Sequence, residues 1–285
     1  MDIKRTILIV ALAIVSYSMV LKWNQDYGQA ALPTQNVATN QSAPAIPDTP
    51  LGTNASASAD VPSANGETSA PLETPVVTNK DLIHVKTDVL DLAIDPQGGD
   101  IAQLKLPLYP RRQDHPDVPF QLFDNGGERT YLAQSGLTGT NGPDARATGR
   151  PVYSTEQKTY QLADGQNQLN VDLKFSHDGV NYIKRFSFTR GLYDLKVTYL
   201  IDNESAKPWT GNLFAQLKRD NGDDPSSSTA TGTATYLCAA LWTSSEPYKK
   251  VSMKDIDKGA LEETVQGGWV AWLQHYFVTA WIPNK

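Results

Sequence analysis

An uncharged apolar segment near the N-terminus is the feature that most limits how this chain can fold. Residues 7–21 carry nine Leu, Ile or Val side chains and no charge, and Lys22 and Trp23 end the run. The segment from 6 to 23 is about 18 residues long, close to the lower limit for a helix that spans a bilayer. Its aliphatic side chains favour membrane insertion by roughly 3 to 5 kcal/mol. We therefore expect a transmembrane signal anchor over residues 6–23.

Two other interpretations of this segment stay open. The apolar region of a cleaved signal peptide is usually about 7 to 15 residues long, and a small-x-small cleavage site follows it closely. Here Asn24, Gln25 and Asp26 follow instead, and the candidate site at residues 28–30 lies farther along the chain. The remaining interpretation is a helix buried in a protein core.

The basic residues around the segment predict its orientation. Lys4 and Arg5 precede it, and after Lys22 the next basic residue is Lys80. The positive-inside rule places the basic flank in the cytoplasm. We therefore expect residues 1–5 in the cytoplasm of a bacterial cell, and the chain beyond the segment in the periplasm.

A long segment of low complexity follows. Residues 24–79 are rich in Ala, Pro, Thr, Ser, Asn and Gln, and their five charges are all acidic. Such a composition buries too little apolar surface to offset the entropy lost on ordering the backbone. We expect a disordered linker with a root-mean-square span on the order of 40 Å. A spacer and a tolerated insertion fit this sequence equally well.

Period-two alternation dominates residues 80–285, which number about 200 and suffice for one large domain. The three clearest runs, in which apolar and polar side chains alternate, are residues 90–95, 169–176 and 195–202. This pattern is typical of antiparallel strands with one buried and one solvated face. We therefore expect one all-β domain over residues 80–285.

Turn signals separate these runs. Asp164-Gly165 and Asp178-Gly179 supply the positive φ angle that tight hairpin turns need, and Gly191 fits the next turn. Strands should therefore recur from Tyr160 to Ile201 as a meander. Before the C-terminal region no stretch has a clear helical pattern, so a β-sandwich is the predicted architecture.

The C-terminal region is unusually aromatic. Residues 267–283 contain three tryptophans, a tyrosine and a phenylalanine. We expect a short helix over 268–274 and then a strand over 275–282. The aromatic side chains either pack in the core or form a contact surface. Residues 283–285 follow this strand where a turn and a return strand would be expected, so we predict that the domain is truncated at its C-terminal end.

No catalytic, cofactor-binding or metal-ligating residue is predicted from the sequence. The single cysteine, Cys238, cannot form an intramolecular disulfide, and we expect a buried thiol. The acidic run at residues 220–224 lacks the spacing of an EF-hand loop, so we expect a solvated loop there. The histidines lack the spacing of zinc ligands, and they are His84, His115, His177 and His275.

Charge and motifs exclude several functional classes. The formal net charge of −6 argues against a nucleic-acid partner. The sequence contains no phosphate-binding glycine loop, nucleophile elbow or metalloprotease helix motif. We therefore expect no cofactor and no metal, and we predict that the chain is not an enzyme.

Several stretches of the chain match a known family. They are the N-terminal segment with Trp23, residues 85–92 with 98–100, residues 134–139 with 142–144, residues 165–167, and residues 267–283. In this order they span nearly the whole chain apart from the linker. On these residues the chain resembles the N-terminal part of the YidC membrane protein insertases of Gram-negative bacteria.

The resemblance implies a first transmembrane helix and a large periplasmic domain of β-supersandwich fold in the bacterial inner membrane. It also implies a role in inserting and folding inner-membrane proteins, alone or with the Sec translocon. The implied partners are the lipid bilayer, nascent membrane proteins and Sec translocon components. The family's later bundle of five transmembrane helices has no counterpart in these residues, so no groove residue is carried over and the chain is expected to be inactive alone.

Two alternative functions stay open. One is a membrane-anchored periplasmic domain that binds carbohydrate or resembles mutarotases, and the other is a generic anchored adaptor. A mutarotase-like site needs histidines and a carboxylate that converge in one cleft. Clustering of His84, His177 or His275 with a carboxylate would favour the first alternative.

Overall fold

The computed structural model divides the chain into two compact units, residues 1–52 and 53–285, and describes residues 16–19, 81–126, 129–222 and 237–283. In the first unit residues 16–19 are helical. The rest of the predicted anchor over 6–23 lies outside the described residues, as does the predicted linker over 24–79. Within the described ranges, no helix combines the length and the apolar character needed to cross a bilayer.

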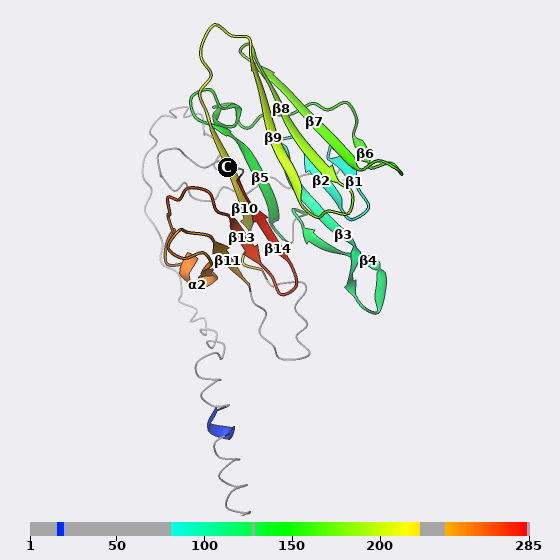
Figure 1. The fold of residues 1–285 in the computed structure, drawn as a ribbon, viewed down its shortest axis with the longest axis vertical. Helices are drawn as coiled ribbons and strands as arrows, with labels where there is room; N and C mark the ends of the chain where they lie inside the picture. Colours follow the sequence, from blue (N-terminus) through cyan, green and yellow to red (C-terminus); the bar gives the residue numbers. More distant parts are fainter. Residues whose placement is uncertain (1–15, 20–80, 127–128, 223–236, 284–285) are drawn as a thin grey trace, which may run out of the picture. The chain divides into compact units, whose positions relative to one another are not determined.

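The described part of the second unit is built from β-strands, which confirms the all-β prediction (Figure 1). Its two helical turns are η1 (Pro143–Ala145) and α2 (Met253–Ile256). The strands are β1 (Ile83–Lys86), β2 (Asp91–Asp95), β3 (Asp100–Arg112), β4 (His115–Phe123), β5 (Tyr131–Thr138), β6 (Thr159–Gln161), β7 (Gln168–His177), β8 (Val180–Thr189), β9 (Leu195–Asn203), β10 (Asn212–Arg219), β11 (Cys238–Leu241), β12 (Lys249–Ser252), β13 (Val270–Leu273) and β14 (Val278–Trp281).

The strands form three sheets. The largest has the order β10-β5-β3-β2-β1-β6, with β4 paired to β3. A second sheet has the order β7-β8-β9, and its strands run side by side in Figure 1. The third has the order β12-β11-β13-β14. The predicted meander is confirmed for β7 to β9, since Asp178, Gly179 and Gly191 adopt positive φ angles at its two turns.

Two details of the strand predictions are wrong. Tyr160 lies in β6, which pairs in parallel with β1 rather than with the meander. This strand is three residues long, so tertiary packing rather than local sequence chooses its partner. The second face of β2 is solvated only at its ends, because Asp91 and Asp95 are half-buried whereas Ala93 is 2% exposed and packs with Leu82 and Ala102.

The main core lies between the three-stranded sheet and the largest sheet. Side chains of β8 alternate strictly between buried and half-buried positions. Phe186 and Phe188 enter a cluster that also holds residues of β1, β2, β3 and β5. Burying a large apolar side chain stabilises the fold by roughly 1.5 to 3 kcal/mol. Lys184 follows this burial pattern but differs in polarity, because it places an amine on the otherwise apolar buried face of β8.

The short helix predicted over residues 268–274 is wrong. This segment contains β13, which pairs with β11 and β14. Gly267 and Gly268 have φ angles of 79° and 98°, which are incompatible with the start of a right-handed helix. The strand predicted over 275–282 is confirmed only for β14.

Packing accounts for most of the C-terminal aromatic side chains. The Trp272 and Trp281 indole N–H groups donate to the carbonyls of Leu217 and Gln216 in β10, at 3.2 and 3.0 Å. Both rings and Phe277 pack against the main core. Tyr276 alone among these residues is strongly exposed, at 71%. The core interpretation therefore holds for these three, while Tyr276 faces solvent.

Candidate functional site

A buried charged cluster is the most distinctive chemical feature of the domain. Arg150 lies between Asp100 and Asp144, and the three side chains are 5%, 6% and 0% exposed. Its Nη2 donates to Asp100 Oδ1 at 2.9 Å, and its Nη1 donates to Asp100 Oδ2. Its Nε donates to Asp144 Oδ1 at 2.8 Å. One guanidinium therefore forms ion pairs with two buried carboxylates.

Further donors complete the coordination of the carboxylates. Gln134 Nε2 donates to Asp100 Oδ2 at 2.7 Å, and the backbone N–H of Leu137 donates to Asp144 Oδ2 at 2.8 Å. All four carboxylate oxygens thus accept at least one hydrogen bond. Charges at a buried site are tolerated only when they are paired and hydrogen-bonded in this way. For Arg150, burial acts to lower the pKa, but the charges of Asp100 and Asp144 outweigh it and raise the pKa overall.

Lys184 extends the cluster into the three-stranded sheet. Its Nζ donates to the carbonyls of Gly98 and Ser135, each at 2.9 Å. Arg150 Nη2 donates to the same two carbonyls, at 3.3 and 3.1 Å. Burial lowers the pKa of Lys184 to about 7, and the charge of Arg150 acts in the same direction. Asp100 and Asp144 oppose this lowering.

We refer to Asp100, Gln134, Asp144, Arg150 and Lys184 as the Arg150 network. Its members come from β3, β5, η1, the loop after η1, and β8. The network therefore joins the two main sheets and fixes the irregular segment between β5 and β6.

Two glycines make room for the network. A Cβ at Gly98, where φ is +77°, would lie 2.2 Å from Arg150 Cζ. A Cβ at Gly136 would lie 2.5 Å from Asp144 Cγ. Sequence comparison with the YidC family singled out residues 98–100, 134–139 and 142–144 without predicting that they meet. The feature of the sequence that indicates such a cluster is that glycines and aspartates occur close together in these stretches.

Two phenols adjoin the network. Tyr153 is buried, and its hydroxyl has no hydrogen-bond partner among the described residues. Burial, followed by the charge of Asp144, raises the pKa of Tyr153. Tyr199 Oη lies 3.0 Å from Ser135 Oγ, and burial raises the pKa of this phenol well above its usual value. Both phenols are therefore neutral near pH 7 and do not act as bases there.

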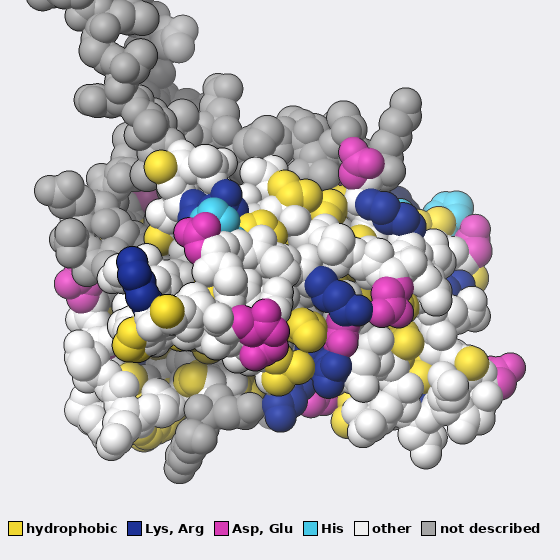
Figure 2. All heavy atoms as spheres, turned by 90° about the horizontal axis from the view of Figure 1, so that it is seen from above, with side chains coloured by type: hydrophobic (Ala, Val, Ile, Leu, Met, Phe, Trp, Pro, Cys, Tyr) yellow, Lys and Arg dark blue, Asp and Glu magenta, His cyan; other side chains and the backbone are white. Residues whose placement is uncertain are grey.

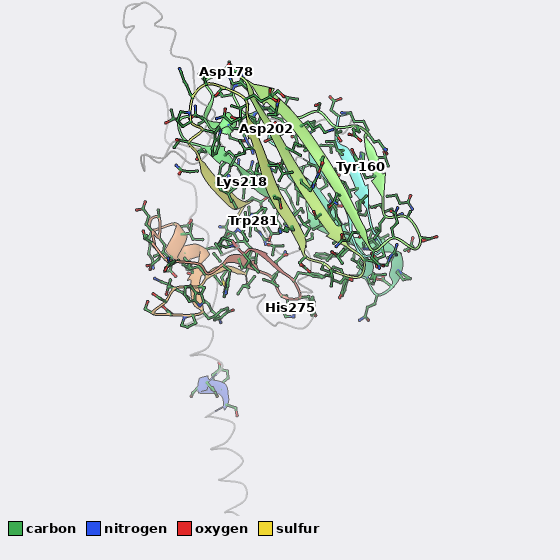
Figure 3. The ribbon with its side chains drawn as sticks, turned by 45° about the horizontal axis from the view of Figure 1, so that its top comes forward. Tyr160, Asp178, Asp202, Lys218, His275 and Trp281 are labelled. Atoms are coloured by element: carbon green, nitrogen blue, oxygen red, sulfur yellow. The ribbon has the colours of Figure 1, made fainter. Side chains whose placement is uncertain are left out.

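The histidines weighed in the sequence are not brought together. His177 ends β7, and its Nε2 lies 3.3 Å from Asp178 of the adjoining exposed turn. Asp178 and His275 lie at opposite ends of the domain in Figure 3. His84 is exposed on β1, and His115 contacts Asp114 at 3.8 Å. In the part of the chain that the structure describes, no three His, Cys, Asp or Glu side chains form a group that could hold a metal ion.

The other residues weighed in the sequence have local roles. Cys238 is buried, as predicted. Asp220 accepts from the backbone N–H of Gly222 in its own loop and from that of Thr130, just before β5. Residues 223–224 lie outside the described ranges. On the face drawn in Figure 2, acidic and basic side chains are interspersed rather than separated by sign.

Replacing Lys184 by Met is expected to flatten the pH dependence of stability. In the folded chain the pKa of Lys184 is about 7, against an ordinary value of 10.5. Between these values the folded state binds fewer protons than the unfolded state, so the free energy of unfolding rises with pH by up to about 1.4 kcal/mol per unit. Urea unfolding of both chains from pH 7 to pH 10 measures the difference.

A matched control is Lys174→Met, because Lys174 is exposed on β7 and pairs with Glu156. This variant should keep the pH slope of the wild-type chain. Equal slopes for the wild-type and Lys184→Met chains would contradict the assignment of a lowered pKa to Lys184.

Fold and cluster together define the class: a β-sandwich domain of three sheets, with a buried ion network between its two main sheets. Residues 82–285 match the family described as the YidC periplasmic domain. Because this match covers well over half of the chain, the chain belongs to the YidC periplasmic domain family. The resemblance stated from the sequence is thereby confirmed.

Relatives extend the similarity to the whole chain. It is 95% identical over 285 residues to the membrane protein insertase YidC of Pseudomonas fluorescens SBW25, with 100% of this chain and 51% of the relative covered. The membrane protein insertases YidC of Pseudomonas syringae pv. syringae B728a and Pseudomonas putida GB-1 are 80% and 77% identical, with the same coverage. The chain thus spans about half the length of the curated relatives it matches.

Proposed function

We propose that the chain is the N-terminal part of a membrane protein insertase that inserts and folds proteins of the bacterial inner membrane. The observation that carries this proposal is the 95% identity, over the whole chain, to a relative named a membrane protein insertase. The partners proposed are the lipid bilayer, nascent membrane proteins and components of the Sec translocon. The proposed divisions are a cytoplasmic end over 1–5, an anchor over 6–23, a linker over 24–79 and a periplasmic domain over 80–285.

Within this insertase we propose a structural rather than an enzymatic role for the β-domain. The carboxylates of the Arg150 network are buried and fully hydrogen-bonded, so they are unsuited to exchange protons with a substrate. Because these carboxylates have all their oxygens hydrogen-bonded, we propose that the β-domain is a rigid unit that positions the rest of the protein. The separation of His177 from His275 gives no support to a mutarotase-like site.

The proposal predicts that these 285 residues do not insert membrane proteins unaided. Cells depleted of their native insertase would receive either this chain or a full-length relative, and insertion of a substrate membrane protein would be followed by protease protection. We expect rescue by the full-length relative alone.

The same cells test the proposed topology. The chain should stay in the membrane pellet after alkaline extraction, and its β-domain should be digested by protease added to the periplasmic side. Restored insertion by the chain alone, or release of the chain by alkali, would contradict the proposal.

A further inference from the structure

Strand β9 forms an open edge of the three-stranded sheet. It is nine residues long and hydrogen-bonds to β8 on one side only. Its register with β8 runs from Leu195 to Asn203 without a shift. Protein edge strands are usually shortened, bulged, interrupted by proline, charged or covered, because their free backbone groups attract other strands. β9 does carry charged side chains, at Lys196 and Asp202. β9 has none of the first three features, and in the described part of the chain no backbone group bonds to its outer edge.

The other long edges differ in this respect. On the outer edge of β7, Ser154 and Lys174 exchange two backbone hydrogen bonds of 2.9 and 2.8 Å. Strand β4 carries Pro116 and Pro119. The carbonyls of β10 receive the indole donors of Trp272 and Trp281. The edge of β9 is therefore the one among these that is suited to accept a further strand.

The hydrogen-bonding phase of β9 determines which residues would bond to that strand. The backbone N–H of Glu204 donates to Gly179 O at 2.9 Å, so these opposite residues are a hydrogen-bonded pair. Hydrogen-bonded and non-hydrogen-bonded pairs alternate along an antiparallel ladder. The residues of β9 that direct their N–H and C=O groups away from β8 are therefore 195, 197, 199, 201 and 203.

We propose that β9 pairs in antiparallel orientation with β9 of a second copy of this chain, about a two-fold axis at Tyr199. In this register residue 195 lies opposite 203, residue 197 lies opposite 201, and Tyr199 lies opposite its own copy. Every outward backbone group of one strand then meets an outward group of the other. The two three-stranded sheets become one sheet of six strands with an isologous interface.

Charge complementarity favours a second copy of the chain as the partner of β9, and it favours this register. Lys196 and Asp202 are both exposed, and Asp202 is labelled on β9 in Figure 3. With the axis at Tyr199, Lys196 of each copy lies directly opposite Asp202 of the other, so the pair forms twice. Thr198 lies opposite Leu200, which is 41% exposed. A shift of two residues in one direction sets Lys196 opposite Leu200, and in the other direction it sets Lys196 opposite Glu204, which lies just beyond the end of β9. The register centred on Tyr199 is therefore the one that pairs Lys196 with an acidic residue within β9.

Charge exchange tests the proposal. The full chain, purified in detergent micelles, is studied by analytical ultracentrifugation over a range of concentrations. We expect a wild-type dimer, and we expect Lys196→Glu and Asp202→Lys each to weaken it by roughly ten-fold, because opposite like charges destabilise strand pairing. An equimolar mixture of the two variants should regain dimerisation, since each altered side chain then meets an opposite charge.

Cysteine pairs test the register. Under oxidation, the Thr198→Cys/Leu200→Cys chain should form a covalent dimer, because these positions lie opposite each other. The single-cysteine Leu200→Cys chain is the matched control, because it keeps the Lys196–Asp202 pair. It should stay uncrosslinked, since residue 200 lies opposite Thr198 of the other copy. Both positions lie on the solvent face, so the thermal unfolding of each reduced chain should match that of the wild-type chain.

A wild-type chain that is monomeric at every concentration would overturn the proposal. So would a dimer that neither charge variant weakens, a mixture that fails to restore dimerisation, or crosslinking of the single-cysteine control as readily as of the cysteine pair. These outcomes do not depend on insertase activity, so they are independent of the proposed function.

Discussion

Replacing Arg150 by Met is expected to lower the free energy of unfolding by about 3 to 5 kcal/mol. The reason is that Asp100 and Asp144 would remain in a site where their side chains are 6% and 0% exposed, without the cation that pairs with both of them. Asp100 also loses its two charged donors, and Asp144 loses one. Urea unfolding of the full chain near pH 7, followed by tryptophan fluorescence, measures the change.

Arg185 provides a matched control. It forms a bidentate pair with Asp172 at 2.7 and 2.6 Å, but the side chains are 37% and 26% exposed. Such pairs contribute about 0 to 1 kcal/mol because water screens them. Arg185→Met should therefore cost far less than Arg150→Met, and similar losses in the two variants would show that the Arg150 network does not carry the stability assigned to it.

Replacing Gly98 by Ala is expected to cost about 2 to 4 kcal/mol, the sum of backbone strain and steric overlap. The φ angle of +77° disfavours any side chain, and the added Cβ would lie 2.2 Å from Arg150 Cζ. The guanidinium would have to move away from Asp100 and Asp144. Urea unfolding again provides the measurement.

Gly165 separates the two contributions. Its φ angle is +81°, yet a Cβ there would have no atom within 4 Å, so Gly165→Ala should cost only about 1 kcal/mol of backbone strain. In an Arg150→Met background, Gly98→Ala should fall toward the same value because the rigid guanidinium is gone. Equal losses at the two glycines in the wild-type background would contradict the steric argument.

Local patterns in the sequence predict a large part of the fold. Alternation predicts β7 and β9, and the Asp178-Gly179 turn predicts the hairpin between β7 and β8. These features depend on residues that are close together in the sequence. The partner of β6 and the strand at 270–273 could not be predicted in this way, because distant segments decide which strands pair. In the sequence, the two consecutive glycines at 267–268 are compatible with the start of a helix. Their positive φ angles in the structure exclude a right-handed helix there.

The Arg150 network could not be predicted from the sequence for a related reason. Lys184 sits in a strand whose alternation assigns its position to the buried face, where a lysine looks like an error in the pattern. Only the fold shows that two backbone carbonyls accept hydrogen bonds from it and that the charges of two buried carboxylates act on it. The family resemblance did select the correct stretches, but it indicated neither their proximity nor the charges they enclose.

The sequence spacing within the Arg150 network bears on how the domain reaches its native state. Lys184 bonds to Gly98 across 86 residues, and Arg150 bonds to Asp100 across 50. Contacts this distant in sequence form slowly, because a long loop must close first. An intermediate with one sheet in place would hold buried charges without their partners, which is costly. The two main sheets should therefore fold as one cooperative unit, with half-assembled forms of the sandwich scarcely populated at equilibrium.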